Sequence, residues 1–357
     1  AAVLAANAAV ASPATPEVVV EKVVPNAALV GGLASGPARD IIVTGANSGV
    51  GINGAKQLVA AGHRVVLACR TQAKADAAAA ECNEYAASAK GPNARPGGTA
   101  TAAVCDLADL ASVRAFAKSV KGKPLDTLVL NAGLAMNTAD KEPKRTAEGF
   151  ELTIGTNHLG HFLLANLLID DLAQKGAAPP RLVVTASPVH DPTSGGGNVG
   201  SLATLGDLSG LASGPKFNMV DGGAYDPDKA YKDSKLCNIL FTAEASRRFS
   251  AKGVTVNSFS PGLIPDPNGF FRYQNQAFAK TFNQISGLAG VKETPFFGGS
   301  CLAYMAVDAS LDAVSGKFYD TYPPGKHQLA SHAPSVEGQN VDEQKKLWDL
   351  SAKLVGV

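Results

Sequence analysis

Short apolar runs alternate with longer Ala- and Leu-rich stretches along most of the chain. The short runs are rich in β-branched residues and leucine and predict strands at 41–43, 64–68, 100–105, 127–130, 181–185 and 254–258. The longer stretches predict helices, one ending near residue 61 and others at 72–89, 112–120, 150–172 and 230–249. Solidly apolar strands that alternate with helices are typical of a parallel sheet covered on both faces. We therefore predict one α/β domain with a doubly wound, mostly parallel sheet of the Rossmann type.

Two long segments interrupt this alternation. Residues 190–229 lie between a predicted strand and a predicted helix and are dense in Gly, Ser and Asp. Residues 265–293 follow the last predicted strand and carry Phe270, Phe271, Tyr273, Phe278 and Phe282. Both follow the carboxyl ends of strands, where sheets of this kind bind ligands. Because long loops in compact domains are usually functional, we expect an insertion at 190–229 and a substrate-side segment at 265–293.

The first 39 residues differ in composition from the rest. They are rich in Ala, Val and Pro and open without Met, as expected after removal of an Ala-rich targeting segment. A solvated tail is one interpretation, and a docking segment for a partner or a membrane surface is another. The stretch Val18–Val24 could also add an edge strand. We divide the chain into a tail at 1–39 and one folded domain at 40–357.

Composition narrows the classes of function. The net charge of +1 gives no reason to expect a nucleic-acid partner. No apolar run approaches the roughly 20 residues of a membrane-spanning helix. The five cysteines are scattered, odd in number and never in CxxC spacing, which favours a reducing compartment. Neither they nor the six histidines show metal-ligand spacing, so we expect no metal site.

A glycine-rich loop, residues 44–51, joins the first predicted strand to its helix. Gly45, Gly49 and Gly51 allow a tight turn and the close approach of a pyrophosphate to the backbone and to a helix N-terminus. A plain strand–helix turn is the alternative. The position of the loop between a strand and a helix favours a dinucleotide site.

The ends of the next strands indicate which dinucleotide binds. An NAD-binding protein would place Asp or Glu after the second strand, but this chain has Arg70, which suits a 2′-phosphate. NADPH is therefore the predicted cofactor. The alternative is that Arg70 is only a solvated surface residue. Asp106, before Leu107, either accepts from the adenine amine or caps the next helix. The small residues Asn131-Ala132-Gly133 let the backbone pass under the cofactor.

Tyr231 and Lys235 are four residues apart, hence on one face of a predicted helix. An ammonium near a phenol favours the phenolate and lowers its pKa, so the tyrosine becomes a usable acid near neutral pH. Lys235 can also hold the nicotinamide ribose. The pair follows a strand that ends near Ser187.

Together these residues resemble the motif set of the short-chain dehydrogenase/reductase family over about 40–265, including Asn157 and Pro261-Gly262. The resemblance implies that Tyr231 donates a proton and that Lys235 activates it. It also implies that Ser187 orients the substrate and that Asn157 holds a relay water. Further cofactor contacts follow at Asn47, Ser48, Leu107 and Ile264.

A closer resemblance is to the light-dependent protochlorophyllide reductases, from about residue 40 to the end of the chain. The segments that match that family are residues 141–143, 149–163, 206–211, 221–223, 230–238 and 346–357. That family implies NADPH, an apolar substrate such as a tetrapyrrole, and a role in chlorophyll biosynthesis in the chloroplast. It also implies that the protein is located in the stroma or on the stromal face of the thylakoid. There it would make peripheral contact with that membrane or with a photosynthetic complex.

The chain departs from that family at two places. Leu263 stands where the family usually has Cys, and 265–267 is Pro-Asp-Pro where a Thr is expected. Three functions stay open: reduction of protochlorophyllide, a plastid carbonyl or ene reductase of another apolar substrate, and a non-catalytic paralogue serving as subunit or assembly factor of a photosynthetic complex. Leu263 and His190 favour the plastid carbonyl or ene reductase. The intact Tyr231 and Lys235 argue against the third.

Overall fold

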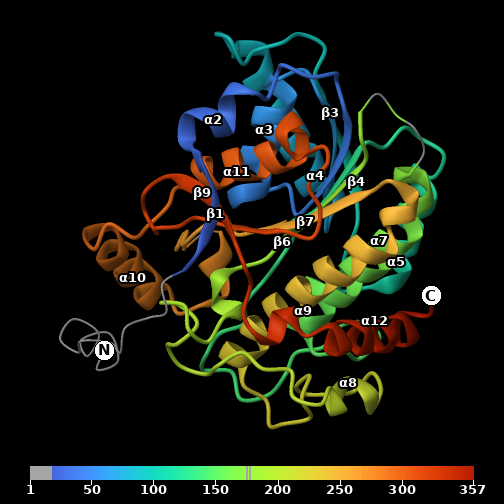
Figure 1. The fold of residues 1–357 in the computed structure, drawn as a ribbon, viewed down its shortest axis with the longest axis vertical. Helices are drawn as coiled ribbons and strands as arrows, with labels where there is room; N and C mark the ends of the chain where they lie inside the picture. Colours follow the sequence, from blue (N-terminus) through green and yellow to red (C-terminus); the bar gives the residue numbers. More distant parts are fainter. Residues whose placement is uncertain (1–17, 174–175, 177, 268) are drawn as a thin grey trace.

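A computed structural model describes residues 18–173, 176, 178–267 and 269–357. Their strands form one nine-stranded sheet with helices on both faces (Figure 1). Its order is β1-β9-β8-β7-β6-β5-β2-β3-β4. The strands are β1 Val20–Pro25, β2 Asp40–Thr44, β3 Arg64–Cys69, β4 Thr99–Val104, β5 Thr127–Leu130, β6 Arg181–Thr185, β7 Thr255–Phe259, β8 Phe318–Asp320 and β9 Gln328–His332. The six expected strands are present, and the predicted doubly wound α/β fold is confirmed.

The helices follow the predicted alternation closely. They are α2 Asn26–Gly31, α3 Gly49–Ala60, α4 Gln72–Ser88, α5 Leu110–Val120, α6 Leu152–Ile154, α7 Gly160–Leu172, α8 Ser209–Ala212, α9 Pro227–Arg248, α10 Gln276–Leu288, α11 Pro295–Val307 and α12 Val341–Val355. Helix α9 begins before the expected residue 230 because Asp226 caps it, accepting from the backbone N–H groups of Asp228 and Lys229 at 2.9 and 3.1 Å. None of the described helices combines the length and apolarity that a bilayer crossing requires.

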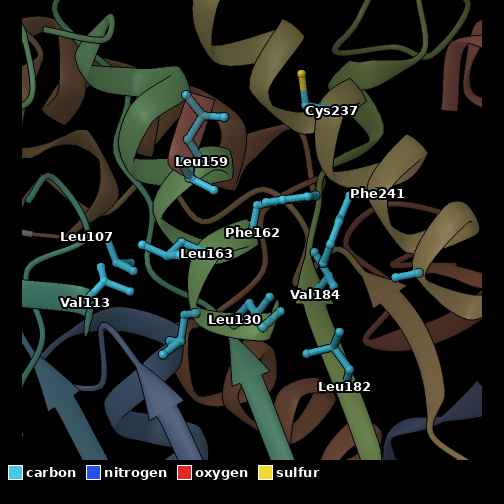
Figure 2. Packing of buried hydrophobic residues seen from close by; sticks show 14 of the residues in the cluster. Leu107, Val113, Leu130, Leu159, Phe162, Leu163, Leu182, Val184, Cys237 and Phe241 are labelled. Atoms are coloured by element: carbon cyan, nitrogen blue, oxygen red, sulfur yellow. The ribbon is translucent and has the colours of Figure 1, made fainter. Parts of the chain in front are cut away.

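Two hydrophobic clusters cover the two faces of the sheet. One joins α5, α7, α9 and α12, and Figure 2 shows Leu163, Phe162 and Phe241 among its members. In the same cluster Trp348 of α12 lies 4.8 Å from the Phe162 ring and 5.7 Å from the Phe241 ring, which fixes α12 against α7 and α9. The other cluster joins α2, α3, α4 and α11.

The division at residue 40 was wrong for the described part of the N-terminal segment. Strand β1 pairs antiparallel with β9, so the edge strand suggested within Val18–Val24 is present. The side chains of Leu29 and Leu33 are buried in the core. These residues pack with the domain because the strand completes the exposed edge of β9 and the leucines cover α11. Residues 1–17 lie outside the described part.

The parallel strands place the site. Chain order reverses between β2 and β5, so the connections from these neighbouring strands run to opposite sides. This switch point opens a crevice at the carboxyl ends of the strands. The loops that follow β2, β3, β5, β6 and β7 therefore meet at one edge of the sheet.

Candidate active site

A cavity of about 1860 Å³ runs along this edge. Its lining begins at the glycine-rich loop and extends to α10 and to the ends of β7 and β8. Ligand pockets commonly measure about 300–1,000 Å³. The cavity is thus large enough for a dinucleotide together with a second sizeable ligand.

The glycine-rich loop fits a cofactor backbone closely. Gly45 has φ +65°, and a Cβ there would lie 2.7 Å from the Cα of Ala132. A Cβ on Gly51 would lie 2.5 Å from the carbonyl oxygen of Gly45. Asn47 and Ser48 line the cavity beside them, at the N-terminus of α3. The loop therefore supplies the tight turn and the helix N-terminus that a pyrophosphate needs.

A buried network that sequence reasoning missed ties this loop to β5. The Thr44 hydroxyl accepts from the backbone N–H groups of Asn131 and Ala132 at 2.9 and 3.0 Å and lies 2.8 Å from Nε2 of His161. Nδ1 of His161 lies 3.1 Å from the backbone oxygen of Asn157. No motif in the sequence marks Thr44 or His161, because their role depends on packing between β2 and α7.

The adenosine end of the cavity carries positive charge. Arg70, at the end of β3, and Lys74, in the first turn of α4, both line it. Lys74 was not predicted, although its spacing of four residues from Arg70 is visible in the sequence. Arg272 and Tyr273 also line the cavity. Two cations at the position where NAD-binding proteins carry a carboxylate fit NADPH.

Asp106 does not cap the following helix. Asp109 does so, accepting from the N–H groups of Ala111 and Ser112 at 2.9 and 3.3 Å. The interpretation of Asp106 as a helix cap was therefore wrong, because a turn follows Asp106 and α5 begins only at Leu110. Asp106 and Leu107 line the cavity, and Asp106 accepts from the N–H of Ala108 at 3.0 Å.

The expected catalytic side chains come together on the nicotinamide side. The Ser187 hydroxyl hydrogen-bonds Tyr231, and Nζ of Lys235 lies 5.6 Å from the centroid of the Tyr231 ring. The Lys235 ammonium also donates to the Thr185 carbonyl at 3.2 Å. Burial lowers the pKa of Lys235 to about 8.

The predicted lowering of the Tyr231 pKa is not found. Burial raises the pKa of Tyr231 above its usual value of 10, and the hydrogen bond with Ser187 only partly opposes this. The cause is the burial of the phenol, and the Lys235 ammonium donates to the Thr185 carbonyl instead. The phenol is thus held protonated, as a proton donor requires.

Asn157 lies in a π-helical segment, Gly155–Leu159, between α6 and α7, which interrupts the single helix expected at 150–172. Its side chain accepts from the N–H of Leu134 at 2.9 Å and donates to the Leu134 carbonyl and to Oγ of Ser234 at 2.9 and 3.0 Å. Short π segments are frequent at functional sites. Asn157 therefore joins the loop after β5 to the catalytic helix α9.

His190 is a structural residue. It is buried, with Nδ1 2.6 Å from the Ser187 carbonyl, and its Nε2 accepts from the N–H of Ser335 at 3.1 Å. Burial lowers its pKa, which keeps it neutral. Both ring nitrogens are occupied, so His190 gives no support to a separate carbonyl-reductase chemistry.

The remaining predicted residues also border this cavity. Gly49, Gly133, Pro261, Gly262 and Ile264 line it together with Leu263. The five cysteines are buried and unpaired.

This combination of a dinucleotide loop at the switch point and a Ser–Tyr–Lys group beyond it defines a class of oxidoreductase. The model of the short chain dehydrogenase family matches residues 39–193. The chain belongs to the short-chain dehydrogenase/reductase family.

Within that family the chain is similar to protochlorophyllide reductases. It is 40% identical over 329 residues to the chloroplastic protochlorophyllide reductase of Chlamydomonas reinhardtii, covering 88% of this chain and 77% of that one. It is 39% identical over 328 residues to the protochlorophyllide reductase of Cucumis sativus, and the match covers 89% of this chain and 78% of that one.

Solved structures agree on the fold. A protein of Mycobacterium paratuberculosis of uncharacterised function has a TM-score of 0.63 at 27% identity, covering 91% of this chain and 97% of that one. L-sorbose reductase of Gluconobacter frateurii, solved with NADPH and L-sorbose, has a TM-score of 0.58 at 18% identity, covering 81% and 95%.

The protein is therefore an NADPH-dependent oxidoreductase of the short-chain type, most like the protochlorophyllide reductases among the functions considered above. Its Tyr231, Lys235 and Ser187 lie together at the cavity. A purely structural subunit or assembly factor is not favoured.

Arg70→Ala should remove most of the preference for NADPH over NADH. A charge-assisted contact to the 2′-phosphate is worth about 1.5–3 kcal/mol, or roughly tenfold to a hundredfold in Kd. Fluorescence titration with both cofactors measures the ratio. Arg64→Ala, on the opposite end of the same strand, is the matched control and should leave the ratio unchanged. Equal binding of NADPH and NADH by the unaltered protein would contradict the assignment.

Proposed function

We propose that this protein reduces a protochlorophyllide-type tetrapyrrole, with hydride from NADPH and a proton from Tyr231. The observation that carries the proposal is one continuous cavity, which extends from the cofactor loop past Tyr231 to an aromatic wall. The similarity to chloroplast protochlorophyllide reductases along most of the chain supports the same substrate class.

The substrate side of the cavity suits a flat, apolar ligand. Phe271 stacks on Phe282 at 5.7 Å, and Phe278 stacks on Phe282 at 5.8 Å. Leu263 and Ile264, beyond the end of β7, line the same space. Aromatic faces of this kind bury large planar area and stack in offset geometry. The wall is therefore suited to a macrocycle more than to a small polar carbonyl compound.

The roles of the catalytic residues follow from their contacts. NADPH bound along the glycine-rich loop would supply the hydride. Tyr231, protonated and hydrogen-bonded to Ser187, delivers the proton to the neighbouring carbon of the ring D double bond, so that one hydride and one proton add across it. Lys235 lines the cavity beside Tyr231 and would hold the nicotinamide ribose when NADPH is bound. Asn157 is buried and bonds both Leu134 and Ser234, so its role in this proposal is to hold the loop after β5 against α9.

We place the protein in the chloroplast, in the stroma or against the stromal face of the thylakoid. The chloroplast relatives support this, and so does the exposure of apolar side chains on α10. Leu288 is 91% exposed, and Phe278 and Ile285, which also line the cavity, are 44% and 43% exposed. An apolar helix face beside a cavity for an apolar ligand suits peripheral contact with a membrane surface.

Tyr231→Phe should bind NADPH almost normally and lose turnover by a factor of about 10²–10⁴, because only the proton donor is removed. Lys235→Ala should impair both NADPH binding and turnover, since Lys235 is proposed to contact the ribose and also lies beside Tyr231. The measurement is an absorbance titration with protochlorophyllide, followed by illumination with NADPH. Unchanged turnover in Tyr231→Phe would mean that the proton comes from another group. Failure of the unaltered protein to bind the pigment would refute the proposed substrate.

Leu263→Cys should increase the rate of photoreduction, which we expect to be slow in the unaltered protein. Leu263 lines the cavity beside the cofactor end of β7, and it can neither donate a proton nor titrate. Leu263→Ala separates the two effects, because it removes bulk without adding a thiol. Product absorbance after brief illumination measures the rate. Rapid photoreduction by the unaltered protein would show that this position does not limit the reaction.

A further inference from the structure

A short segment crosses above the cofactor loop and is fastened on both sides of it. We call residues 271–274 the strap; most of it lies in the short helix η4, Phe270–Tyr273. On one side, Nε2 of Gln274 donates to the Met136 carbonyl at 2.7 Å, and its Oε1 accepts from the N–H of Thr138 at 3.4 Å. On the other side, the Tyr273 phenol hydrogen-bonds Arg70.

The strand order shows what lies beneath the strap. Met136 and Thr138 belong to the loop after β5, and Arg70 follows β3. Strand β2 lies between β5 and β3, and the glycine-rich loop follows β2. A segment fastened to both neighbours must therefore pass over the groove in which a dinucleotide would lie.

The strap brings a third cation to the adenosine end. The Arg272 guanidinium lies 4.7 Å from the centroid of the Tyr273 ring and donates to the Gly269 carbonyl at 3.0 Å. Arg70, Lys74 and Arg272 all line the cavity. Burial raises the pKa of Tyr273, but its hydrogen bonds to Arg272 and Arg70 outweigh this and bring it below 10. These surroundings favour negative charge.

We propose that Arg272 and Tyr273 bind the 2′-phosphate of NADPH together with Arg70, and that this phosphate holds the strap closed. The strap continues directly into α10, which carries Phe278 and Phe282 of the aromatic wall. NADPH, through the 2′-phosphate of its adenosine half, thus holds α10 in place as one wall of the substrate space, and NADH does not. The proposal concerns the cofactor and is independent of the substrate proposed above.

Calorimetry with adenosine 2′,5′-bisphosphate and with AMP tests the phosphate contact, since the two ligands differ only in that phosphate. Arg272→Ala should weaken the bisphosphate about tenfold or more and leave AMP unchanged. Tyr273→Phe should weaken it by a smaller factor, about threefold. Lys280→Ala, on the exposed face of α10, is the control and should change neither. An unchanged bisphosphate affinity in Arg272→Ala, or an equal loss for both ligands, would overturn the proposal.

Hydrogen exchange tests the fastening without any pigment. Saturating NADPH should slow exchange of the amides in 271–288 at least tenfold, and saturating NADH should not. In Arg272→Ala the protection should be lost even with NADPH at saturation. Equal protection by NADH, or protection that persists in Arg272→Ala, would show that the 2′-phosphate does not hold the strap.

Discussion

The site depends on one buried hydroxyl, that of Thr44. Nδ1–H of His161 donates to the Asn157 carbonyl, so its Nε2 accepts a hydrogen bond from the Thr44 hydroxyl. The Thr44 oxygen is then free to accept from the backbone of Asn131 and Ala132. This requires a neutral His161, and burial lowers its pKa to about 4. Every partner is satisfied, which a buried polar network needs if it is to stabilise the fold.

The same network extends from the cofactor groove to the proton donor. Asn157 bonds Ser234, and the Ser234 hydroxyl donates to the Tyr231 carbonyl at 2.6 Å. The ends of β2 and β5 and the catalytic turn of α9 are therefore held by one set of hydrogen bonds.

The sequence predicts this framework well because its signals are local. Apolar runs place the six strands β2 to β7, and glycines mark the cofactor loop. The Tyr231–Lys235 spacing marks one helix face, and the resemblance to a known family assigns their roles. The sequence does not predict β8 or β9, and it offers β1 only as a possible edge strand, because these strands are short or polar and are defined by pairing with distant partners. The direction of the Tyr231 pKa, the cap role of Asp109 and the Thr44–His161 contact also depend on burial and packing, which periodicity does not carry.

The affinity of Thr44→Val for NADPH tests the central claim most directly. Valine matches the shape of threonine but leaves the N–H groups of Asn131 and Ala132 and Nε2 of His161 without their partner. NADPH should bind at least tenfold more weakly at a temperature where the variant is fully folded. Thr242→Val is the matched control, because that buried hydroxyl bonds only Asn238 in its own helix, at 2.8 Å. Normal NADPH affinity in folded Thr44→Val would contradict the claim that this hydroxyl sets the cofactor site.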